Sequence, residues 1–278
     1  MAKITIAKSA GFCFGVKRAI DLAQDIASKN KDVYTFGPLI HNPQEVARLE
    51  KENIKVIEDY SNIEKGILVL RTHGISLNIY ENLSQKENIK IVDATCPFVK
   101  KAQDIIKELS TDSEQIVIVG EKKHPEVVAL VSYGKGKCLV VEDIKDVKNV
   151  KKTDIIYIVS QTTQSPKKFE EIVNEISKIS QVKVFNTICR ATFDRQSAAE
   201  KLAKEVDIMI VIGGKNSGNT TRLYQICSAI TTTYHIENID EIERDWFNDI
   251  KNIGITAGAS TPDWIIEKIK RRIQEITN

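Results

Sequence analysis

Hydrophobic positions along the chain follow two different spacings, which predict helices and strands in alternation. Helical spacing of apolar residues begins near Val16, Val99 and Ala198. Short runs that are apolar at almost every position lie between these stretches, such as residues 116–120 and 208–213. Strands that are apolar on both faces and separated by helices are typical of parallel sheets covered on both sides. The pattern therefore predicts an α/β fold with mainly parallel sheets.

This order of elements repeats three times along the chain. Each copy starts with a cysteine, and a small polar residue or histidine follows 28 residues later. The three pairs are Cys13 and His41, Cys96 and His124, and Cys189 and Ser217. The third copy lacks the strand that ends the other two, and the first residues of the chain have the character to supply it. We therefore predict three similar α/β units that close into a ring: 14–95, 96–188, and 189–278 completed by strand 1–13.

Composition supports a globular protein and excludes some classes of function. The 278 residues are 42% hydrophobic and 28% charged, which suits three small domains of roughly 90 residues each. A net charge of +2 gives no electrostatic reason to expect binding to nucleic acid or to an anionic membrane. Since no apolar run is long enough to cross a bilayer and the N-terminus lacks a signal core, we expect a cytoplasmic protein.

The repeated cysteines are candidate metal ligands. Each lies just before a predicted helix, where free backbone N–H groups and the helix dipole favour a thiolate. Isolated cysteines are commonly buried apolar residues, and we assign that role to Cys138 and Cys227, which fall outside the repeat. Structural zinc usually has four ligands, often in close C-x-x-C pairs that this chain lacks. Three thiolates on an iron–sulfur cluster would leave one iron open to a substrate oxygen, so the spacing favours the cluster while zinc stays an alternative.

The turns that follow the predicted strands carry polar groups suited to an anion. Because the carboxyl ends of parallel strands meet at one edge of a sheet, these groups are expected to lie near the cysteines. Small polar residues at a helix start can act as caps, but the same place also binds phosphate. Lys215 could add a cation, whereas His235 lies within a predicted strand and is assigned a structural role. The candidate residues are His41, His73, His124, Thr162, Ser217, Asn219 and Ser260.

Glu126 is the one carboxylate close to these turns, two residues after His124. An acidic residue in the first turn of a helix is often no more than a partner for the helix dipole. Only the second copy has a carboxylate at this place, however, so we expect the asymmetric step of the chemistry, proton delivery, to occur here.

Several motifs together resemble one known family, the LytB family of 4-hydroxy-3-methylbut-2-enyl diphosphate reductases. The resemblance extends from about residue 5 to the C-terminus. The motifs are GFCFGVKRA, GPLIHNP, RTHGIS, DATCP, GEKKHPEV, SQTT, NTICRATFDRQ, GGKNSGNT and TAGASTPDW.

The resemblance implies a monomer of three α/β units in a pseudo-threefold arrangement around a central [4Fe-4S] cluster with one open iron site. It also implies the last reaction of the non-mevalonate isoprenoid pathway. In that reaction an allylic alcohol diphosphate loses its hydroxyl group and gains two electrons and protons, giving isopentenyl and dimethylallyl diphosphate. The electron donor would be a protein such as ferredoxin or flavodoxin.

Carried over by position, the resemblance makes Cys13, Cys96 and Cys189 the cluster ligands. Thr162 and Glu126 would lie at the hydroxyl end of the substrate, with Glu126 in the proton relay. Family members often have a second serine where this chain has Gly218, whose backbone N–H could still bind phosphate. The diphosphate ligands would be His41, His73, His124, Ser217, Gly218, Asn219 and Ser260.

Two other classes of function remain open on the residues alone. A redox-neutral iron–sulfur hydro-lyase would use the same open iron but would need no electrons. A sensor that binds iron–sulfur or zinc would need no ring of polar groups. Electron demand distinguishes the first class from a reductase, and substrate turnover distinguishes the second.

Overall fold

The computed structural model describes residues 2–113 and 115–278. Backbone contacts divide the chain into two compact units. The C-terminal unit consists of Met1–Lys17, Ile40–Arg48 and Arg190–Asn278. The central unit consists of Arg18–Leu39 and Leu49–Cys189. Neither unit is a continuous piece of the chain.

The C-terminal unit contains a four-stranded parallel sheet in the order β1-β12-β10-β11. Its strands are β1 (Lys3–Ile6), β10 (Ile208–Ile212), β11 (Thr232–Ile236) and β12 (Asn252–Ala257). Its helices are α7 (Arg190–Ala203), α8 (Gly218–Ser228) and α9 (Asp263–Thr277), with short 3₁₀ turns η3 (Ile239–Glu241) and η4 (Arg244–Phe247). The first strand of the chain therefore lies beside the last.

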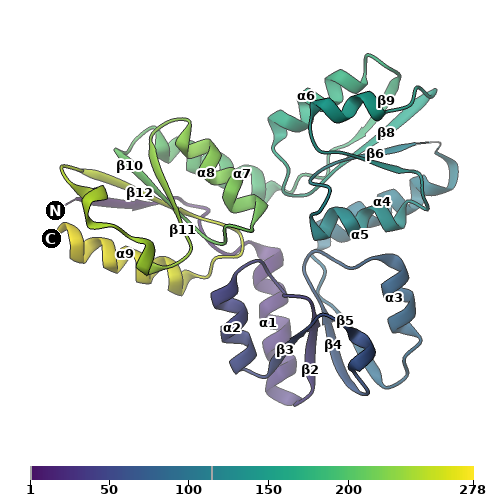
Figure 1. Cartoon of the computed structure of the whole chain (residues 1–278), viewed down its shortest axis with the longest axis horizontal. Helices are drawn as coiled ribbons and strands as arrows, with labels where there is room; N and C mark the ends of the chain where they lie inside the picture. The colour runs from purple at the N-terminus through teal and green to yellow at the C-terminus, as the bar shows by residue number, and fades with distance from the viewer. Residues whose placement is uncertain (1, 114) are drawn as a thin grey trace. The chain divides into compact units, whose positions relative to one another are not determined.

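Residues on β10 alternate between the two faces of this sheet, as a strand requires. Ile210 packs with α9 residues such as Ile269, whereas Met209 packs with Leu202 of α7 and Leu223 of α8. Figure 1 shows α9 on one side of the sheet and α7 and α8 on the other. All five β10 side chains are buried, which explains the unbroken apolar run at 208–212.

The central unit contains two further parallel sheets with the same strand order, β5-β4-β2-β3 and β9-β8-β6-β7. The first sheet has β2 (Val33–Phe36), β3 (Ile54–Ile57), β4 (Gly66–Leu70) and β5 (Ile89–Asp93). The second has β6 (Ile116–Val119), β7 (Cys138–Val141), β8 (Ile155–Ser160) and β9 (Gln181–Phe185). The helices and 3₁₀ turns that lie wholly in this unit are α3 (Leu77–Ser84), α4 (Pro97–Asp112), α5 (Pro125–Tyr133), α6 (Pro166–Ile176), η1 (Tyr60–Asn62) and η2 (Ile144–Asn149).

The predicted α/β fold with mainly parallel sheets is confirmed, and the three predicted helices do start directly after the repeated cysteines. They are α1 (Phe14–Lys29), α4 and α7. Proline occupies the first helical position of α4, α5 and α6 and also of α2 (Pro43–Lys51), where its missing N–H is not needed. Among the described residues, no helix combines the length and the hydropathy that a membrane span requires. The domain boundaries inferred from the repeat stay a prediction.

The strand order determines where ligand-binding turns lie. In the central unit the chain passes outward from β2 to β3 and from β4 to β5, and likewise from β6 to β7 and from β8 to β9. The connections therefore diverge between the two inner strands, which is where α/β sheets bind ligands. In the C-terminal unit this point lies between β10 and β12, and in the central unit between β2 and β4 and between β6 and β8. Every polar site residue predicted from the sequence follows one of these six strands. Each repeated cysteine follows the outer strand β1, β5 or β9.

Replacing Ile210 by alanine should lower the free energy of unfolding by about 2–5 kcal/mol, because it leaves a cavity between β10 and α9. The side chain is fully buried in the sheet of the C-terminal unit. Urea unfolding measures the change. Ile230→Ala, at a side chain that is 38% exposed, is the control and should cost much less. Equal losses in the two variants would contradict the packing described for β10.

Candidate functional site

The three repeated cysteines have the same backbone environment. Each cysteine N–H donates a hydrogen bond to the carbonyl of a residue in the turn after the neighbouring strand. The pairs are Cys13 to Ala259 at 3.1 Å, Cys96 to Thr72 at 3.0 Å and Cys189 to Thr162 at 2.9 Å. All three thiols are half-buried and form no disulfide. A reduced thiol at the start of a helix, partly shielded from water, is a suitable ligand for a metal or a metal cluster.

The other two cysteines have a different environment. Burial raises the pKa of the Cys138 and Cys227 thiols to about 12, so both stay protonated at neutral pH. Cys138 begins β7 and Cys227 lies near the end of α8, away from any strand-to-helix turn of the repeat. Their assignment as structural residues fits these positions.

Glu126 and Thr162 form a buried pair in the central unit. Glu126 lies in the first turn of α5, and Thr162 lies in the turn after β8. One carboxylate oxygen of Glu126 accepts the Thr162 N–H at 2.6 Å, and the other accepts the Thr162 hydroxyl at 2.8 Å. Burial raises the pKa of Glu126 to about 7, against the opposing effect of the two Thr162 hydrogen bonds. At neutral pH this carboxyl group can therefore both hold and release a proton.

Two histidines lie next to this pair in the same unit. His124 caps α5, and its Nδ1 accepts the Glu126 N–H at 3.2 Å. A nitrogen that accepts carries no proton, so the His124 proton is assigned to Nε2. The rings of His73 and His124 meet edge to face with centroids 5.5 Å apart, and ring nitrogens of the two lie within 4.8 Å. The central unit thus brings four predicted residues together: His73, His124, Glu126 and Thr162.

Polar residues of the C-terminal unit gather at the turns after β10 and β12. Ser217 caps α8 by accepting the Thr220 N–H, and Gly218 is the first residue of that helix. Asn219 is only 6% exposed, yet its side-chain nitrogen and oxygen have no hydrogen-bond partner among the described residues. A buried amide costs stability unless a ligand or water satisfies it, so Asn219 is suited to a polar ligand.

Residues 40–48 also belong to the C-terminal unit, although β2 and β3 on either side of them do not. The Ser260 hydroxyl donates to the backbone carbonyl of His41 at 2.9 Å. The two segments approach so closely here that position 214 requires glycine, because a Cβ on Gly214 would lie 3.0 Å from the same carbonyl. The unit therefore brings His41 and Ser260 together with the turn that carries Ser217 and Asn219.

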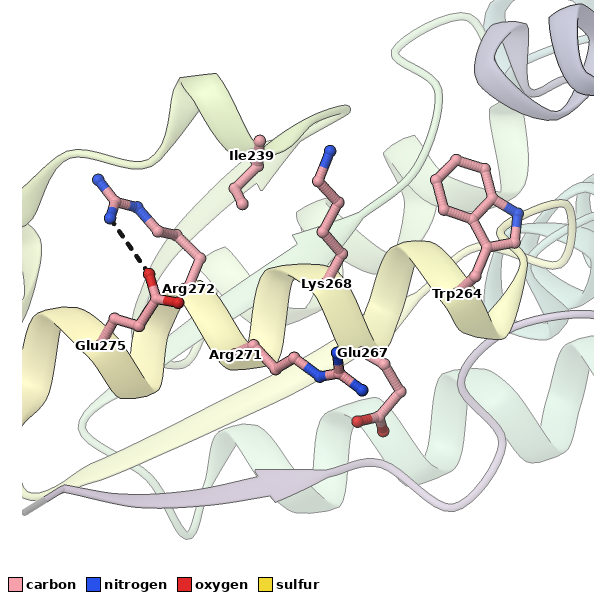
Figure 2. Close-up of a pocket in the computed structure, with 7 residues that line it drawn as sticks. All are labelled: Ile239, Trp264, Glu267, Lys268, Arg271, Arg272 and Glu275. Carbon is pink, nitrogen blue, oxygen red and sulfur yellow. Dashed lines mark hydrogen bonds and ion pairs between the residues drawn. The ribbon is translucent and has the colours of Figure 1, made fainter.

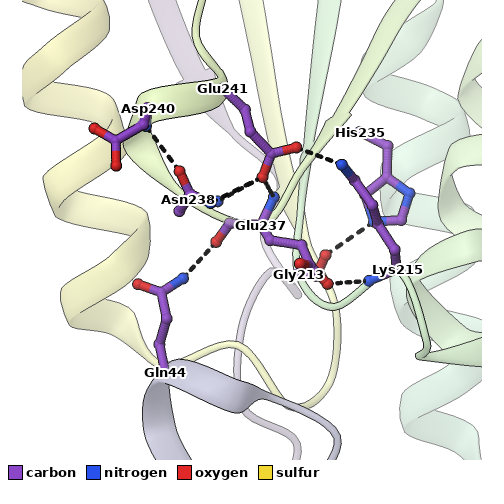
Figure 3. Close-up of polar contacts among 8 residues, drawn as sticks. All are labelled: Gln44, Gly213, Lys215, His235, Glu237, Asn238, Asp240 and Glu241. Carbon is purple, nitrogen blue, oxygen red and sulfur yellow. Dashed lines mark hydrogen bonds and ion pairs between the residues drawn. The ribbon is translucent and has the colours of Figure 1, made fainter.

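A network of hydrogen bonds holds the turn after β10 in place (Figure 3). The Glu237 carboxylate accepts the Lys215 N–H at 2.6 Å, and the Glu237 carbonyl accepts the Gln44 side chain at 2.6 Å. His235 Nε2 contacts the Gly213 carbonyl at 2.9 Å. Lys215 pairs through its ammonium group with Glu241, so the cation that the sequence offered for a bound anion already has a carboxylate partner in the protein.

The supporting residues Gln44, Glu237 and Glu241 were not predicted from the sequence. A signal was present, since an acidic residue follows the second strand of every copy, but it had no assigned role. A cavity of about 350 Å³ beside α9 was also missed, and Figure 2 shows Trp264 and Lys268 among its lining residues. None of the predicted site residues lines that cavity.

These observations define the class: an α/β protein with three equivalent parallel sheets, whose half-buried thiols and phosphate-type donors recur at the same strand-to-helix turns. The chain belongs to the LytB family, since the model of the family described as "LytB protein" matches residues 4–274.

Named relatives match along the whole chain. The 4-hydroxy-3-methylbut-2-enyl diphosphate reductase of Aquifex aeolicus is 48% identical over 282 residues, covering 99% of this chain and 97% of that protein. The protein of the same name from Geobacter sulfurreducens is 47% identical over 278 residues, covering 99% and 98%.

Solved structures of similar proteins agree with the fold. One is described as the diphosphate reductase that is the terminal enzyme of the non-mevalonate pathway. It is 48% identical, with a TM-score of 0.74, and covers 99% of this chain and 100% of that chain. The reductase from Plasmodium falciparum is 27% identical, with a TM-score of 0.92, and covers 100% and 88%.

Glu126 should make stability depend on pH. Its carboxyl group binds a proton more tightly in the folded protein, with a pKa of about 7, than at its ordinary value of 4.5. This contribution is present below pH 4.5 and is lost as the pH rises towards 7. From pH 4.5 to 7 the free energy of unfolding of Glu126→Gln should therefore rise relative to wild type by up to about 3 kcal/mol.

Urea unfolding between pH 4.5 and 8 measures this difference, with the exposed glutamate variant Glu170→Gln as the control. Parallel stability curves for Glu126→Gln and wild type would show that the Glu126 pKa is not raised.

Proposed function

We propose that this chain is a 4-hydroxy-3-methylbut-2-enyl diphosphate reductase, as its relatives are named. The substrate would lose its allylic hydroxyl group as water and take up two electrons and two protons. The products would be isopentenyl and dimethylallyl diphosphate, which differ in the carbon that receives a proton. The observation that carries the proposal is the buried Glu126–Thr162 pair, a carboxyl group with a pKa of about 7 at a turn lined by candidate ligands.

Cys13, Cys96 and Cys189 would hold a [4Fe-4S] cluster. The donor set fits, because three cysteines that form no disulfide occupy the same position at the starts of three helices. When bound, such a cluster supplies electrons one at a time and a Lewis-acidic iron. Three protein ligands would leave the fourth iron open.

The diphosphate would bind where the chain offers neutral donors. The buried amide of Asn219 has no partner within residues 2–113 and 115–278, and His124 can point its Nε2–H at an oxygen. The Ser260 hydroxyl donates to the His41 carbonyl, so it would have to turn to donate to phosphate. The proposed set is completed by His41, His73, Ser217 and the backbone N–H of Gly218.

Glu126 would deliver a proton to the leaving hydroxyl group through Thr162. When Glu126 is protonated, its O–H can donate to the Thr162 hydroxyl oxygen, and the Thr162 hydrogen is then free to donate to the substrate. Burial keeps the pair out of water, which prevents bulk solvent from competing for this proton. Loss of the proton would leave the carboxylate with the two Thr162 hydrogen bonds that it has in this structure.

The reaction consumes two electrons that the allylic alcohol cannot provide, so an electron-transfer protein such as ferredoxin or flavodoxin is part of the proposal. We also infer a reducing, cytoplasmic location, because none of the five described cysteines forms a disulfide. The monomeric state is inferred from the family resemblance.

The proposal is tested under anaerobic conditions. The protein is loaded with iron and sulfide, reduced viologen is supplied, and its oxidation is followed after addition of 4-hydroxy-3-methylbut-2-enyl diphosphate. Oxidation that depends on substrate and yields both five-carbon diphosphates supports the reductase. A loaded protein that turns the substrate over without consuming electrons would instead be a hydro-lyase, and one without any turnover would be a sensor.

Glu126→Gln should lower kcat by about 100-fold or more, because general acid catalysis contributes at least that much. KM should change little, since glutamine keeps an acceptor for Thr162. For wild type, kcat/KM should fall about tenfold per pH unit above pH 7, and this dependence should vanish in the variant. Glu170→Gln is the control, and an unchanged kcat in Glu126→Gln would remove this residue from the proton path.

Asn219→Ala should weaken binding of inorganic diphosphate by about tenfold, because a buried donor to an anion is lost. Isothermal titration calorimetry on the loaded protein measures the change. Asn216→Ala, an exposed residue in the same turn, serves as the matched control. If both variants bind diphosphate as wild type does, Asn219 is not a ligand.

A further inference from the structure

The hydrogen-bond network that holds the turn after β10 has an equivalent at the turn after β6. In the central unit the Glu142 carboxylate accepts the Lys122 N–H at 3.1 Å. In the C-terminal unit the Glu237 carboxylate accepts the Lys215 N–H at 2.6 Å. Glu142 follows β7 and holds the turn after β6, and Glu237 follows β11 and holds the turn after β10. In both turns the bonded N–H lies two residues after the glycine that directly follows the strand.

The two networks also share a second acid. It lies in the 3₁₀ turn after the glutamate, pairs with the lysine ammonium group and accepts the glutamate N–H at 2.9 Å. The members are Lys122, Glu142 and Asp146 in the central unit, and Lys215, Glu237 and Glu241 in the C-terminal unit. Repetition of all these contacts on separate sheets argues against a chance surface arrangement.

Each network lies directly before proposed ligand residues. His124 comes two residues after Lys122, and Ser217 comes two residues after Lys215. Because the lysine backbone is fixed, the start of the following helix is fixed as well. The networks therefore determine where the donor groups of these turns point.

In the part of the chain that the structure describes, the C-terminal network alone is joined to a third segment. Gln44, three residues after His41, donates to the Glu237 carbonyl across 193 positions of sequence. The same segment is held by Ser260 at the His41 carbonyl and by Trp264, whose indole N–H donates to Glu45 at 3.0 Å. Glu237 thus contacts both the turn of Ser217 and Asn219 and the segment of His41, as Figure 3 shows for Gln44 and Lys215.

We propose that Glu237 is a positioning residue for the diphosphate site, holding the β10 turn with its carboxylate and the His41 segment with its carbonyl. This inference rests on the proposed function, which places His41, Ser217 and Asn219 around the diphosphate. Glu237 touches no substrate itself. It acts by keeping donors from two distant segments at the separation that one diphosphate requires.

The test measures binding of inorganic diphosphate, KM, kcat and the melting temperature of the cluster-loaded protein. Glu237→Ala should raise the Kd for diphosphate and KM by about tenfold, with kcat at saturating substrate within about twofold of wild type. Glu237→Gln keeps an acceptor for the Lys215 N–H and should restore both constants to within about threefold of wild type.

Gln44→Ala leaves the carboxylate network intact and should raise Kd and KM by about threefold, because one neutral hydrogen bond is lost. This variant keeps the test decisive if Glu237→Ala does not fold. The matched control is Asp240→Ala, which removes an exposed acid from the same 3₁₀ turn and should change neither constant.

Two results would overturn the inference while the proposed function stands. The first is wild-type binding and KM in Glu237→Ala or, where that variant does not fold, in Gln44→Ala. The second is a lower melting temperature without a rise in KM at nearly constant kcat, which is what a purely structural residue would give. If the wild-type protein binds no diphosphate and turns over no substrate, the proposed function fails, and this inference fails with it.

Discussion

The parallel direction of the strands is the constraint on which the rest of the structure depends. When every strand of a sheet runs the same way, all strand-to-helix turns lie at one edge, with helix N-termini facing outward. One sheet can therefore present a thiol and two polar turns together, using β1, β10 and β12 in the C-terminal unit. The same order in the other two sheets repeats this arrangement, and single changes such as Glu126 then make one copy chemically different from the others.

Glu126 shows how such a change affects both stability and chemistry. Burying a carboxyl group is unfavourable for its charged form, and the two hydrogen bonds from Thr162 offset only part of that cost. The remaining imbalance appears as a pKa close to neutral pH. A fully compensated carboxylate would stabilise the fold better but would hold no proton to donate. The energetic cost of burying this group and its ability to donate a proton therefore have the same cause.

The parallel α/β fold and the helices after the cysteines could be predicted from the sequence, because both follow from local spacing and from repetition. His73, His124, Glu126 and Thr162 could also be placed at strand ends, and the structure brings these four together. The bond from Ser260 to the His41 carbonyl and the pairing of Lys215 with Glu241 could not be predicted. Such partners depend on which distant segments meet, as for Gln44 and Glu237, and no period in the sequence encodes that choice.

Because β1 pairs with β12, the order in which the strands are synthesised differs from the order in which they can pair. Lys3 faces Asn252, so β1 leaves the ribosome about 250 residues before the strand that pairs with its backbone groups. The central unit, whose two sheets lie between these ends, can fold earlier from a shorter length of chain. During translation the N-terminal segment is thus an unpaired strand edge, the kind of surface on which chaperones act and from which aggregation starts.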